Sequence, residues 1–155
     1  NPQNYDCIFE KYCSHADILM NGIYWDKNIP RLFSMETLKE KDFRIKTIAD
    51  ITDDEHGSVP CNLGDAVMED PVYGVNKMTG EKTKPYLEES VDVMAVGNMP
   101  NELPRDASRF FGEQLIKHVL GDILNGGSDI IDRATILKDG KLTPQFAYLE
   151  DYAAE

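Results

Sequence analysis

VDVMAVGNMPNELPRDASRFFG, residues 91–112, is the stretch of sequence that decides the fold. It predicts a buried apolar strand over residues 91–96, a tight corner at Gly97-Asn98, and then a helix whose first turn tolerates Pro104. In an open α/β sheet, the ligand crevice lies outside the carboxyl end of a strand, at a corner of this kind. The stretch therefore predicts a strand of the sheet and one wall of a ligand site.

An earlier stretch repeats this pattern of a strand followed by a polar corner. Residues 45–51 are apolar enough for a buried strand, and they run into TDDEHG (residues 52–57). Before them, residues 16–24 predict another mostly apolar strand, and Ser34 is a suitable N-cap for a helix over residues 35–41. This strand–helix–strand alternation, with runs that we expect to be buried on both faces, predicts a parallel sheet. Two such corners indicate a nucleotide or small-molecule site.

The remaining segments complete an α/β chain. Residues 57–90 lose all periodicity and are rich in Gly, Pro, Asp and Lys, which predicts a long ordered excursion. Asn101 is a suitable cap for a long helix that ends near residue 124, and Asp139-Gly140 predicts a tight hairpin before a last helix. One face of the long helix is apolar, and we expect it to pack on a core; it consists of Phe111, Leu115, Val119 and Ile123.

Composition and charge limit the classes of partner. The formal net charge of −12 on 155 residues argues against nucleic acid, because clustered Lys and Arg hold phosphate backbones. No apolar run approaches the roughly 20 residues that cross a bilayer, so we expect no membrane partner. The three cysteines form no CxxC pair, which predicts reduced thiols and a cytoplasmic location; they are Cys7, Cys13 and Cys61.

The acidic corner after residues 45–51 allows three interpretations. Four carboxylates and one imidazole lie within seven residues: Asp50, Asp53, Asp54, Glu55 and His56. Hard cations collect carboxylate oxygens, but the chain offers no second ligand set, so we expect no metal site. The corner is otherwise a solvated acidic turn or a substrate-contacting loop. In the second case its carboxylates accept hydrogen bonds from an ammonium group, and its backbone N–H groups bind a carboxylate.

Gly97-Asn98 allows two interpretations. Both residue types tolerate a positive φ, as a turn before a helix requires. Equally, a position without a side chain lets a flat cofactor ring approach the backbone. The chain has no GxGxxG motif, the glycine turn that brings a pyrophosphate to a helix N-terminus. If the sheet is of the Rossmann type, we expect its first half to be absent from this chain.

Three motifs resemble those of a known enzyme group. They are ADILMNGIYWDKNIP (residues 16–30), TIADITDD (residues 47–54) and MAVGNMPNELPRDASRFF (residues 94–111). In order and spacing, over residues 6–125, the chain resembles the C-terminal part of the NAD-dependent, lysine-forming saccharopine dehydrogenases and the lysine–oxoglutarate reductases. This group lies within the alanine dehydrogenase and transhydrogenase superfamily. Residues 57–90 look more like the reductases than the shorter fungal dehydrogenases.

The resemblance implies a division of the chain. Residues 1–100 correspond to the second half of a Rossmann-like parallel sheet, the dinucleotide-binding domain, with residues 57–90 inserted. Residues 101–155 correspond to a returning long helix, a hairpin and a C-terminal helix. The family's catalytic lysine and histidine lie in its N-terminal region. The resemblance therefore implies no catalytic residue in this chain, which we expect to need the N-terminal part of its own polypeptide and to be inactive alone.

The resemblance also implies binding residues. Family contacts to the nicotinamide and ribose of NAD or NADP fall on Tyr24, Ile51, Val96, Gly97, Asn98 and Met99. Family contacts to the substrate fall on Thr52, Asp53 and Asp54. The chain departs from the pattern where the dehydrogenases place an acidic residue followed by His, because Gly97-Asn98 stands there.

These observations predict part of an NAD(P)-dependent oxidoreductase of lysine metabolism. We expect hydride transfer at the amine or imine carbon of saccharopine. The small-molecule substrate is then saccharopine, or lysine plus 2-oxoglutarate. An oligomer is compatible with this prediction. Two alternatives stay open. One is an alanine dehydrogenase-like enzyme on a smaller amino acid, and the other is a non-catalytic binding or regulatory half-domain.

Overall fold

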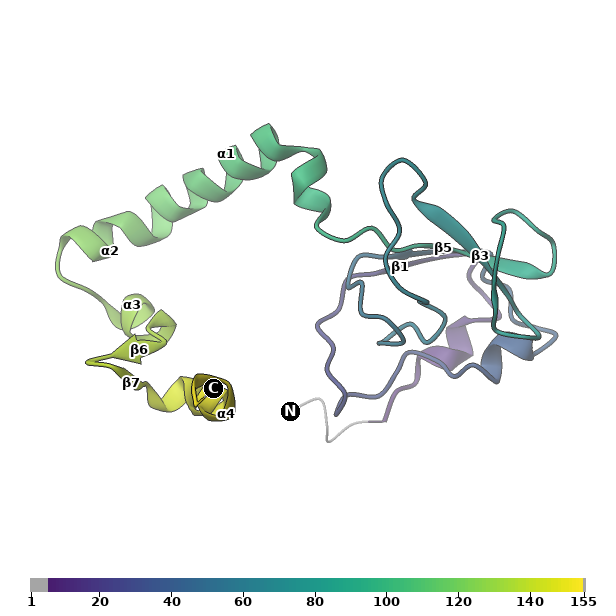
Figure 1. Cartoon of the computed structure of the whole chain (residues 1–155), viewed down its shortest axis with the longest axis horizontal. Helices are drawn as coiled ribbons and strands as arrows, with labels where there is room; N and C mark the ends of the chain where they lie inside the picture. The colour runs from purple at the N-terminus through teal and green to yellow at the C-terminus, as the bar shows by residue number, and fades with distance from the viewer. Residues whose placement is uncertain (1–5, 155) are drawn as a thin grey trace. The chain divides into compact units, whose positions relative to one another are not determined.

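Parallel strands organise the N-terminal part of the molecule. The computed structural model describes residues 6–154, which divide into two compact units between Glu102 and Leu103 (Figure 1). The first unit holds a sheet whose strands, in chain order, are β1 (Ile18–Asn21), β2 (Thr47–Asp50), β3 (Val72–Asn76), β4 (Lys82–Thr83) and β5 (Ser90–Met94).

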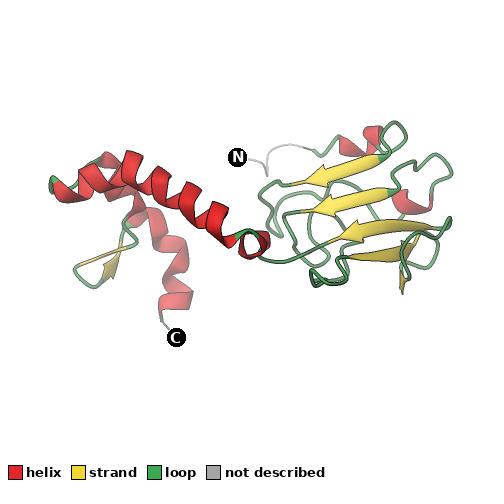
Figure 2. Ribbon diagram, turned by 90° about the horizontal axis from the view of Figure 1, so that it is seen from above, coloured by secondary structure: helices red, strands yellow, loops and turns green. Residues whose placement is uncertain are grey.

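The described strands of this unit are arranged in the order β1-β2-β5-β3-β4. β1 pairs with β2, and β2 with β5, in parallel, so that Ile48 lies between Leu19 and Val93. β3 runs antiparallel to β5, and β4 antiparallel to β3. Figure 2 shows the strands side by side. The predicted α/β class is thus confirmed, and the predicted parallel sheet is a mixed one, because β3 runs antiparallel to both of its neighbours.

The parallel strands bury one face more fully than the other. Leu19, Ile48 and Val93 lie in the core, whereas Ile18 and Met20 of β1 are exposed. Side chains alternate between the two faces of a strand, so the exposed residues share one face of β1. The expectation that the runs are buried on both faces is wrong for this unit, because its described segments leave that face partly open.

The connection between β1 and β2 supplies much of the core. Phe33 and Phe43 are buried with their ring centroids 5.6 Å apart. The helix predicted over residues 35–41 forms only the 3-10 turn η3 (Thr37–Lys39), because the backbone at Glu40 is already extended. The Ser34 hydroxyl accepts a hydrogen bond from the Thr37 N–H at 3.1 Å, as the predicted cap requires. Another short turn, η2 (Phe9–Tyr12), packs on the same core.

Residues 57–90 are not irregular throughout. They contain β3 and β4, and β3 buries Tyr73 and Val75 beside β5. The expectation of an excursion without strand periodicity is therefore wrong. The strand pattern is hidden by Gly74, which β4 approaches so closely that a Cβ there would overlap the Lys84 carbonyl oxygen. Glycine in a strand often marks a close backbone approach of this kind.

The second unit is helical, with one small hairpin. The turn η4 (Met99–Glu102) precedes it, and α1, η5 and α2 follow one another without a break, η5 being one π-helical turn. Its elements are α1 (Pro104–Leu115), η5 (Ile116–Leu120), α2 (Gly121–Leu124), α3 (Asp129–Ala134), β6 (Leu137–Lys138), β7 (Lys141–Leu142), η6 (Pro144–Leu149) and α4 (Glu150–Ala153).

Of two local predictions for this unit, the cap of the long helix is wrong and the hairpin is correct. Asn101 does not cap the long helix; it lies in η4, and the helix begins at Pro104, whose missing N–H suits the first helical position. The predicted hairpin is confirmed. Asp139 and Gly140 join β6 to β7 with φ values of 53° and 75°, as a tight turn of this type requires.

The apolar face of the long helix is not buried by its own unit. Phe111 is 64% exposed, and Leu115 and Ile123 are exposed as well. The expectation that this face packs on a core is wrong within residues 103–154, none of which is buried. The helices and hairpin of this unit are too short and too few to cover it.

Among residues 6–154, no helix combines the length and apolarity needed to cross a membrane.

Candidate functional site

The carboxyl ends of the three parallel strands lie at one edge of the sheet. The segments that leave these ends are residues 22–25 after β1, residues 51–54 after β2 and residues 95–98 after β5. Eight of the nine residues predicted to bind cofactor or substrate lie in these segments, and the ninth, Met99, follows directly. Because parallel strands end side by side, the fold brings the two sequence corners to the same edge.

Hydrogen bonds tie these segments together. The Ile51 N–H donates to the Asn21 carbonyl oxygen at 2.8 Å, and the Thr52 hydroxyl donates to the Ile23 carbonyl oxygen at 2.7 Å. The Ala66 N–H donates to the Ala95 carbonyl oxygen at 2.7 Å, which brings the segment after residue 57 alongside the end of β5. Three strand ends and one inserted segment therefore form a connected edge.

A buried carboxylate lies beneath this edge. Asp50, the last residue of β2, is 1% exposed. Its oxygens accept hydrogen bonds from the Asn21 side-chain amide at 2.7 Å and from the Asn62 side-chain amide at 2.9 Å. The Asn21 amide also donates to the Ser58 hydroxyl at 2.8 Å. Such pairing is what allows a charged group to remain buried, since an unpaired carboxylate in the interior is very costly.

The same network reaches β3. The Tyr73 hydroxyl donates to the Asn62 side-chain oxygen at 3.2 Å and accepts from the Leu63 N–H at 2.8 Å. Burial raises the pKa of Tyr73 to about 12, so the phenol stays protonated and remains a donor. The Gly64 N–H donates to the same Asn62 oxygen at 2.9 Å. The network thereby fixes the path of residues 62–64 toward the strand ends.

Two carboxyl groups lie over Gly97. A Cβ at Gly97 would stand 3.2 Å from Asp53 Oδ2 and 3.4 Å from Asp65 Oδ2, so the missing side chain leaves room for both carboxyls. Asp53 and Asn98 both adopt positive φ, at 56° and 52°. Non-glycine residues seldom adopt this conformation, and they do so more often at functional sites.

Asp53 has an altered acidity. Its pKa is raised by burial first and then by the negative charge of Asp65, with a smaller contribution from Asp50. Its Oδ1 atom is buried, and within residues 6–154 no hydrogen-bond partner reaches it. Titratable groups with perturbed pKa values are concentrated at functional sites, although structural clusters show them as well.

The predicted binding residues differ in what they present. Tyr24 is 80% exposed and Ile51 is 47% exposed, so both side chains are free to contact a ligand. The Val96 side chain is buried, so only its backbone is available. Thr52, Asp53 and Asp54 are half-buried at the β2 corner, while Asn98 is exposed and Met99 is half-buried.

Sequence reasoning missed four polar residues of this edge: Asn21, Ser58, Asn62 and Asp65. Asn21 offered a signal, because a polar side chain at the end of an apolar strand indicates a buried hydrogen-bond partner. The other three residues lie in the segment expected to leave the sheet, and nothing in its composition indicates that the chain returns to the strand ends there; they are Ser58, Asn62 and Asp65.

Within residues 6–154, no three His, Cys, Asp or Glu side chains are arranged to hold a metal ion.

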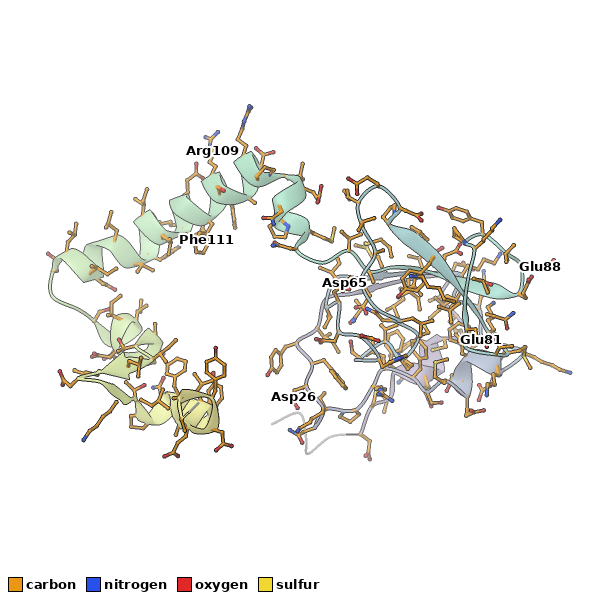
Figure 3. All side chains as sticks on the ribbon, in the orientation of Figure 1. Asp26, Asp65, Glu81, Glu88, Arg109 and Phe111 are labelled. Atoms are coloured by element: carbon orange, nitrogen blue, oxygen red, sulfur yellow. The ribbon has the colours of Figure 1, made fainter. Side chains whose placement is uncertain are left out.

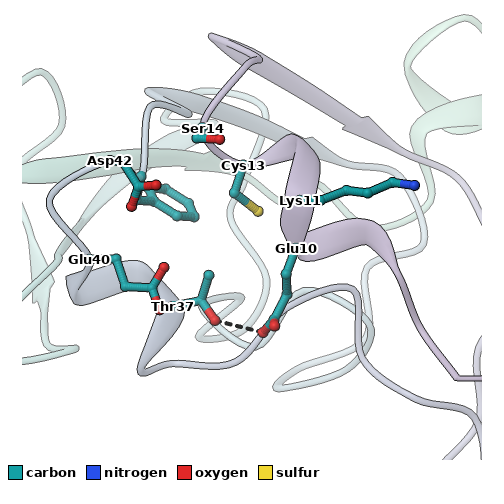
Figure 4. A pocket seen from close by; sticks show the side chains of 8 residues that line it. Glu10, Lys11, Cys13, Ser14, Thr37, Glu40 and Asp42 are labelled. Atoms are coloured by element: carbon teal, nitrogen blue, oxygen red, sulfur yellow. Dashed lines mark hydrogen bonds between the residues drawn. The ribbon is translucent and has the colours of Figure 1, made fainter.

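A separate cavity of about 250 Å³ lies among the segments that lead into β1 and β2 (Figure 4). Glu10 accepts hydrogen bonds there from the Thr37 hydroxyl at 2.6 Å and the Ser34 N–H at 3.0 Å. Burial, followed by the charge of Glu10, raises the pKa of the Cys13 thiol to about 11, which keeps it protonated and unreactive. The cavity lies toward the amino ends of the strands, where α/β sheets do not place their ligands.

Comparison with known proteins adds relatives of named activity. No protein-family model matches the chain. It is 28% identical to the alpha-aminoadipic semialdehyde synthase of Arabidopsis thaliana over 96% of its own length and 15% of that protein. It is 25% identical to the mitochondrial enzyme of the same name from Rattus norvegicus, over 97% of the chain and 20% of that protein.

A second kind of relative is shorter. The chain is 30% identical to the NAD(+)-dependent, L-lysine-forming saccharopine dehydrogenase of Candida albicans, over 68% of the chain and 26% of that protein. The chain thus spans between about a seventh and a quarter of the length of these relatives. The resemblance seen in the three motifs is confirmed. This chain is homologous to one segment of the saccharopine dehydrogenases and alpha-aminoadipic semialdehyde synthases, enzymes of lysine metabolism.

Proposed function

We propose that this chain forms the nicotinamide-facing and substrate-facing edge of an NAD(P)-dependent oxidoreductase. The reaction is reversible hydride transfer at the amine or imine carbon of saccharopine, the secondary amine that joins lysine to 2-oxoglutarate. The observation that supports this most is the convergence of the three strand ends at one edge, where the missing side chain of Gly97 leaves room for two carboxyl groups. The homology to saccharopine dehydrogenases supports the substrate class.

The cofactor contacts belong to the nicotinamide half of NAD or NADP. We assign them to Tyr24, Ile51 and residues 96–99. The acidic corner suits an oxidised nicotinamide ring, which carries a positive charge, and it repels phosphates. The pyrophosphate therefore needs a glycine turn and helix N-terminus that these residues do not form. Bound at this edge, the cofactor supplies or accepts the hydride, and the protein orients its ring and excludes water.

The substrate contacts belong to the β2 corner. Hydrogen bonds from the Asn21 and Asn62 side chains to Asp50 fix the end of β2. The residues that follow this fixed end directly, and whose positions it therefore sets, are Thr52, Asp53 and Asp54. Carboxylates there accept hydrogen bonds from the ammonium and secondary amine groups of an amino-acid substrate, in charge-assisted pairs that are stronger than neutral ones. The catalytic lysine and histidine come from the N-terminal part of the polypeptide, so this chain alone is expected to show no turnover.

Binding measurements on the complete polypeptide test this division of roles. Asp54→Ala is expected to weaken saccharopine binding at least tenfold while changing NADH affinity less than twofold, because it removes a substrate contact only. Asn98→Trp is expected to do the reverse, since a bulky side chain at the β5 corner blocks the ring. Glu81→Ala, on the exposed turn between β3 and β4, is the matched control. Equal losses for both ligands with Asp54→Ala would refute the assignment.

The compartment and the assembly are part of the proposal. We propose a cytoplasmic location, although the relative from Rattus norvegicus is named as a mitochondrial enzyme. We also propose that this segment works together with the N-terminal part of its own polypeptide, within a chain that forms an oligomer. Cell fractionation followed by size-exclusion chromatography of the complete protein tests both statements.

A further inference from the structure

Asparagine is followed by glycine at two places in the chain, Asn21-Gly22 and Asn125-Gly126. Glycine has no side chain to shield its backbone nitrogen, so this nitrogen can reach the side-chain amide of the preceding asparagine. Asparagine is among the residue types that proteins lose to slow chemistry of this kind. Because the two pairs share the same local sequence, any difference between their reaction rates must come from the fold.

The fold protects the first pair. Asn21 is 2% exposed, and its side-chain amide donates to Asp50 at 2.7 Å and to Ser58 at 2.8 Å. A reaction would need this amide to leave both acceptors and turn toward the Gly22 nitrogen. That movement deprives a buried carboxylate of a donor, which is costly. Asn21 is therefore held in an unreactive position.

The second pair lies in the open turn after α2. Asn125 and Gly126 are exposed, and a Cβ added to Gly126 would meet nothing within 4 Å. The side-chain hydrogen bond of this turn joins Ser128 to Asp122 at 2.6 Å and does not involve the Asn125 amide. The Gly126 N–H donates a long hydrogen bond of 3.4 Å to the Ile123 carbonyl oxygen. Little therefore opposes the approach of the two reacting groups.

We propose that Asn125 is a site of deamidation in the folded protein. The Gly126 nitrogen gives up its proton and attacks Cγ of the Asn125 side chain. The new N–Cγ bond closes a succinimide ring, the Cγ–Nδ2 bond breaks, and the amide nitrogen leaves as ammonia with that proton. Water then opens the ring at either carbonyl, which yields aspartate or isoaspartate. The reaction consumes only water, and no group is oxidised or reduced.

The products change the turn between α2 and α3. The Gly127 N–H donates to the Asp122 carbonyl oxygen at 2.8 Å and closes the end of α2. Isoaspartate at position 125 lengthens the main chain between these two residues, because the chain then runs through the side-chain carbon. Either product also places a negative charge at the carboxyl end of a helix, which the helix dipole disfavours. Deamidation therefore loosens the connection from α2 to α3.

Incubation of the full chain at mildly alkaline pH, followed by peptide mass spectrometry, tests the proposal. In the folded chain, we expect Asn125 to react about tenfold faster than Asn21 or more, because reaction at Asn21 requires local opening of the sheet. In urea, the two sites should react at similar rates. Asn28, which is exposed but precedes the β-branched Ile29, is the control for slow reaction. Equal rates at Asn21 and Asn125 in the folded chain would overturn the proposal.

Two variants test the chemical route. Gly126→Ala should slow the reaction, because the added methyl group hinders the attacking nitrogen. Gly126 has a φ of 92°, where alanine is strained, so Asn125→Gln is the second variant. It should nearly stop the reaction, since its longer side chain must close a larger ring. Products with aspartate but no isoaspartate would contradict the succinimide route. None of these readouts requires turnover, so a failure here is distinct from a failure of the proposed function.

Discussion

Asn62 is the side chain on which the candidate site depends most at the residue scale. Its amide donates to Asp50, and its oxygen accepts from both Tyr73 and Gly64. Removing one partner from a buried network leaves the others unsatisfied, which costs more than a single hydrogen bond contributes. Asn62 therefore couples the buried carboxylate to the inserted segment.

Asn62→Ala is expected to lower the free energy of unfolding by about 2–4 kcal/mol, because it leaves polar groups of Asp50, Tyr73 and Gly64 unpaired. Urea unfolding followed by circular dichroism measures this. Asn28→Ala, on the exposed loop after β1, is the control and should stay within about 0.5 kcal/mol of the wild type. Similar costs for the two variants would mean that the network contributes little.

The pKa shifts of Asp53 and Glu10 have opposite directions, so they predict opposite dependences of stability on pH. The pKa of Asp53 is raised, so its contribution to the free energy of unfolding is complete below the pKa of an unfolded aspartate and is lost as pH rises through the folded value. The pKa of Glu10 is lowered by hydrogen bonds from Thr37 and then Ser34. Its contribution is therefore present above the pKa of an unfolded glutamate and is lost as pH falls through the folded value.

Unfolding measured at a series of pH values should separate the two groups. Asp53→Asn is expected to remove the fall in stability on the side above the aspartate range, and Glu10→Gln to remove the fall on the acid side. Each variant should leave the other slope in place, because the two side chains belong to different clusters. If Asp53→Asn alters only the acid side, the sign assigned to its pKa is wrong.

At the scale of elements, two glycines in regular structure should respond oppositely to alanine. A Cβ on Gly74 would overlap the Lys84 carbonyl and the Thr83 hydroxyl, so Gly74→Ala should separate β4 from β3 and lower the melting temperature. A Cβ on Gly112, within α1, would meet nothing within 4 Å. Gly112→Ala should stabilise the helix by about 1 kcal/mol. Circular dichroism melts measure both, and a neutral Gly74→Ala would contradict the close approach of β4.

The elements also show how far the sequence could predict this structure. The three parallel strands and the hairpin at Asp139-Gly140 were predictable, because apolar runs and turn residues are local signals. β3 and β4 were not, since Gly74 and the lysines around it remove the strand pattern and only pairing with β5 restores it. The gathering of the candidate residues at one edge was predictable where these residues follow strands, and their role in binding stays a prediction. Asp65 and Asn62 were not predictable, because a long-range return of the chain places them there.

At the scale of the whole molecule, stability is unevenly divided between the two units. Ile48 is 0% exposed in the first unit, whereas Phe111 of the second is mostly exposed and projects from its helix (Figure 3). Elements without buried side chains open readily, because nothing beyond local hydrogen bonds opposes their unfolding. The chain is therefore expected to have one cooperative core, and it lies in the first unit.

Ile48→Ala is expected to cost about 2–5 kcal/mol, because it leaves a cavity between Leu19 and Val93. Phe111→Ala should change the stability of this chain by no more than about 0.5 kcal/mol. Hydrogen exchange read by mass spectrometry should show strong protection in β1, β2 and β5 and weak protection throughout residues 104–153. Equal protection of the two units would show that the second has a core of its own.

The π-helical turn at Ile116–Leu120 has a consequence for how this protein tolerates changes in length. A π turn holds more residues than the α-helical turn it replaces, and such turns occur as single bulges within α-helices. Deleting one residue there is accommodated by converting the bulge into ordinary α-helix, which leaves the faces of α1 and α2 in their present alignment. The same deletion within α1 rotates everything after it by about 100°. A lineage of such chains could therefore lose a codon at this one place and keep its helix in register.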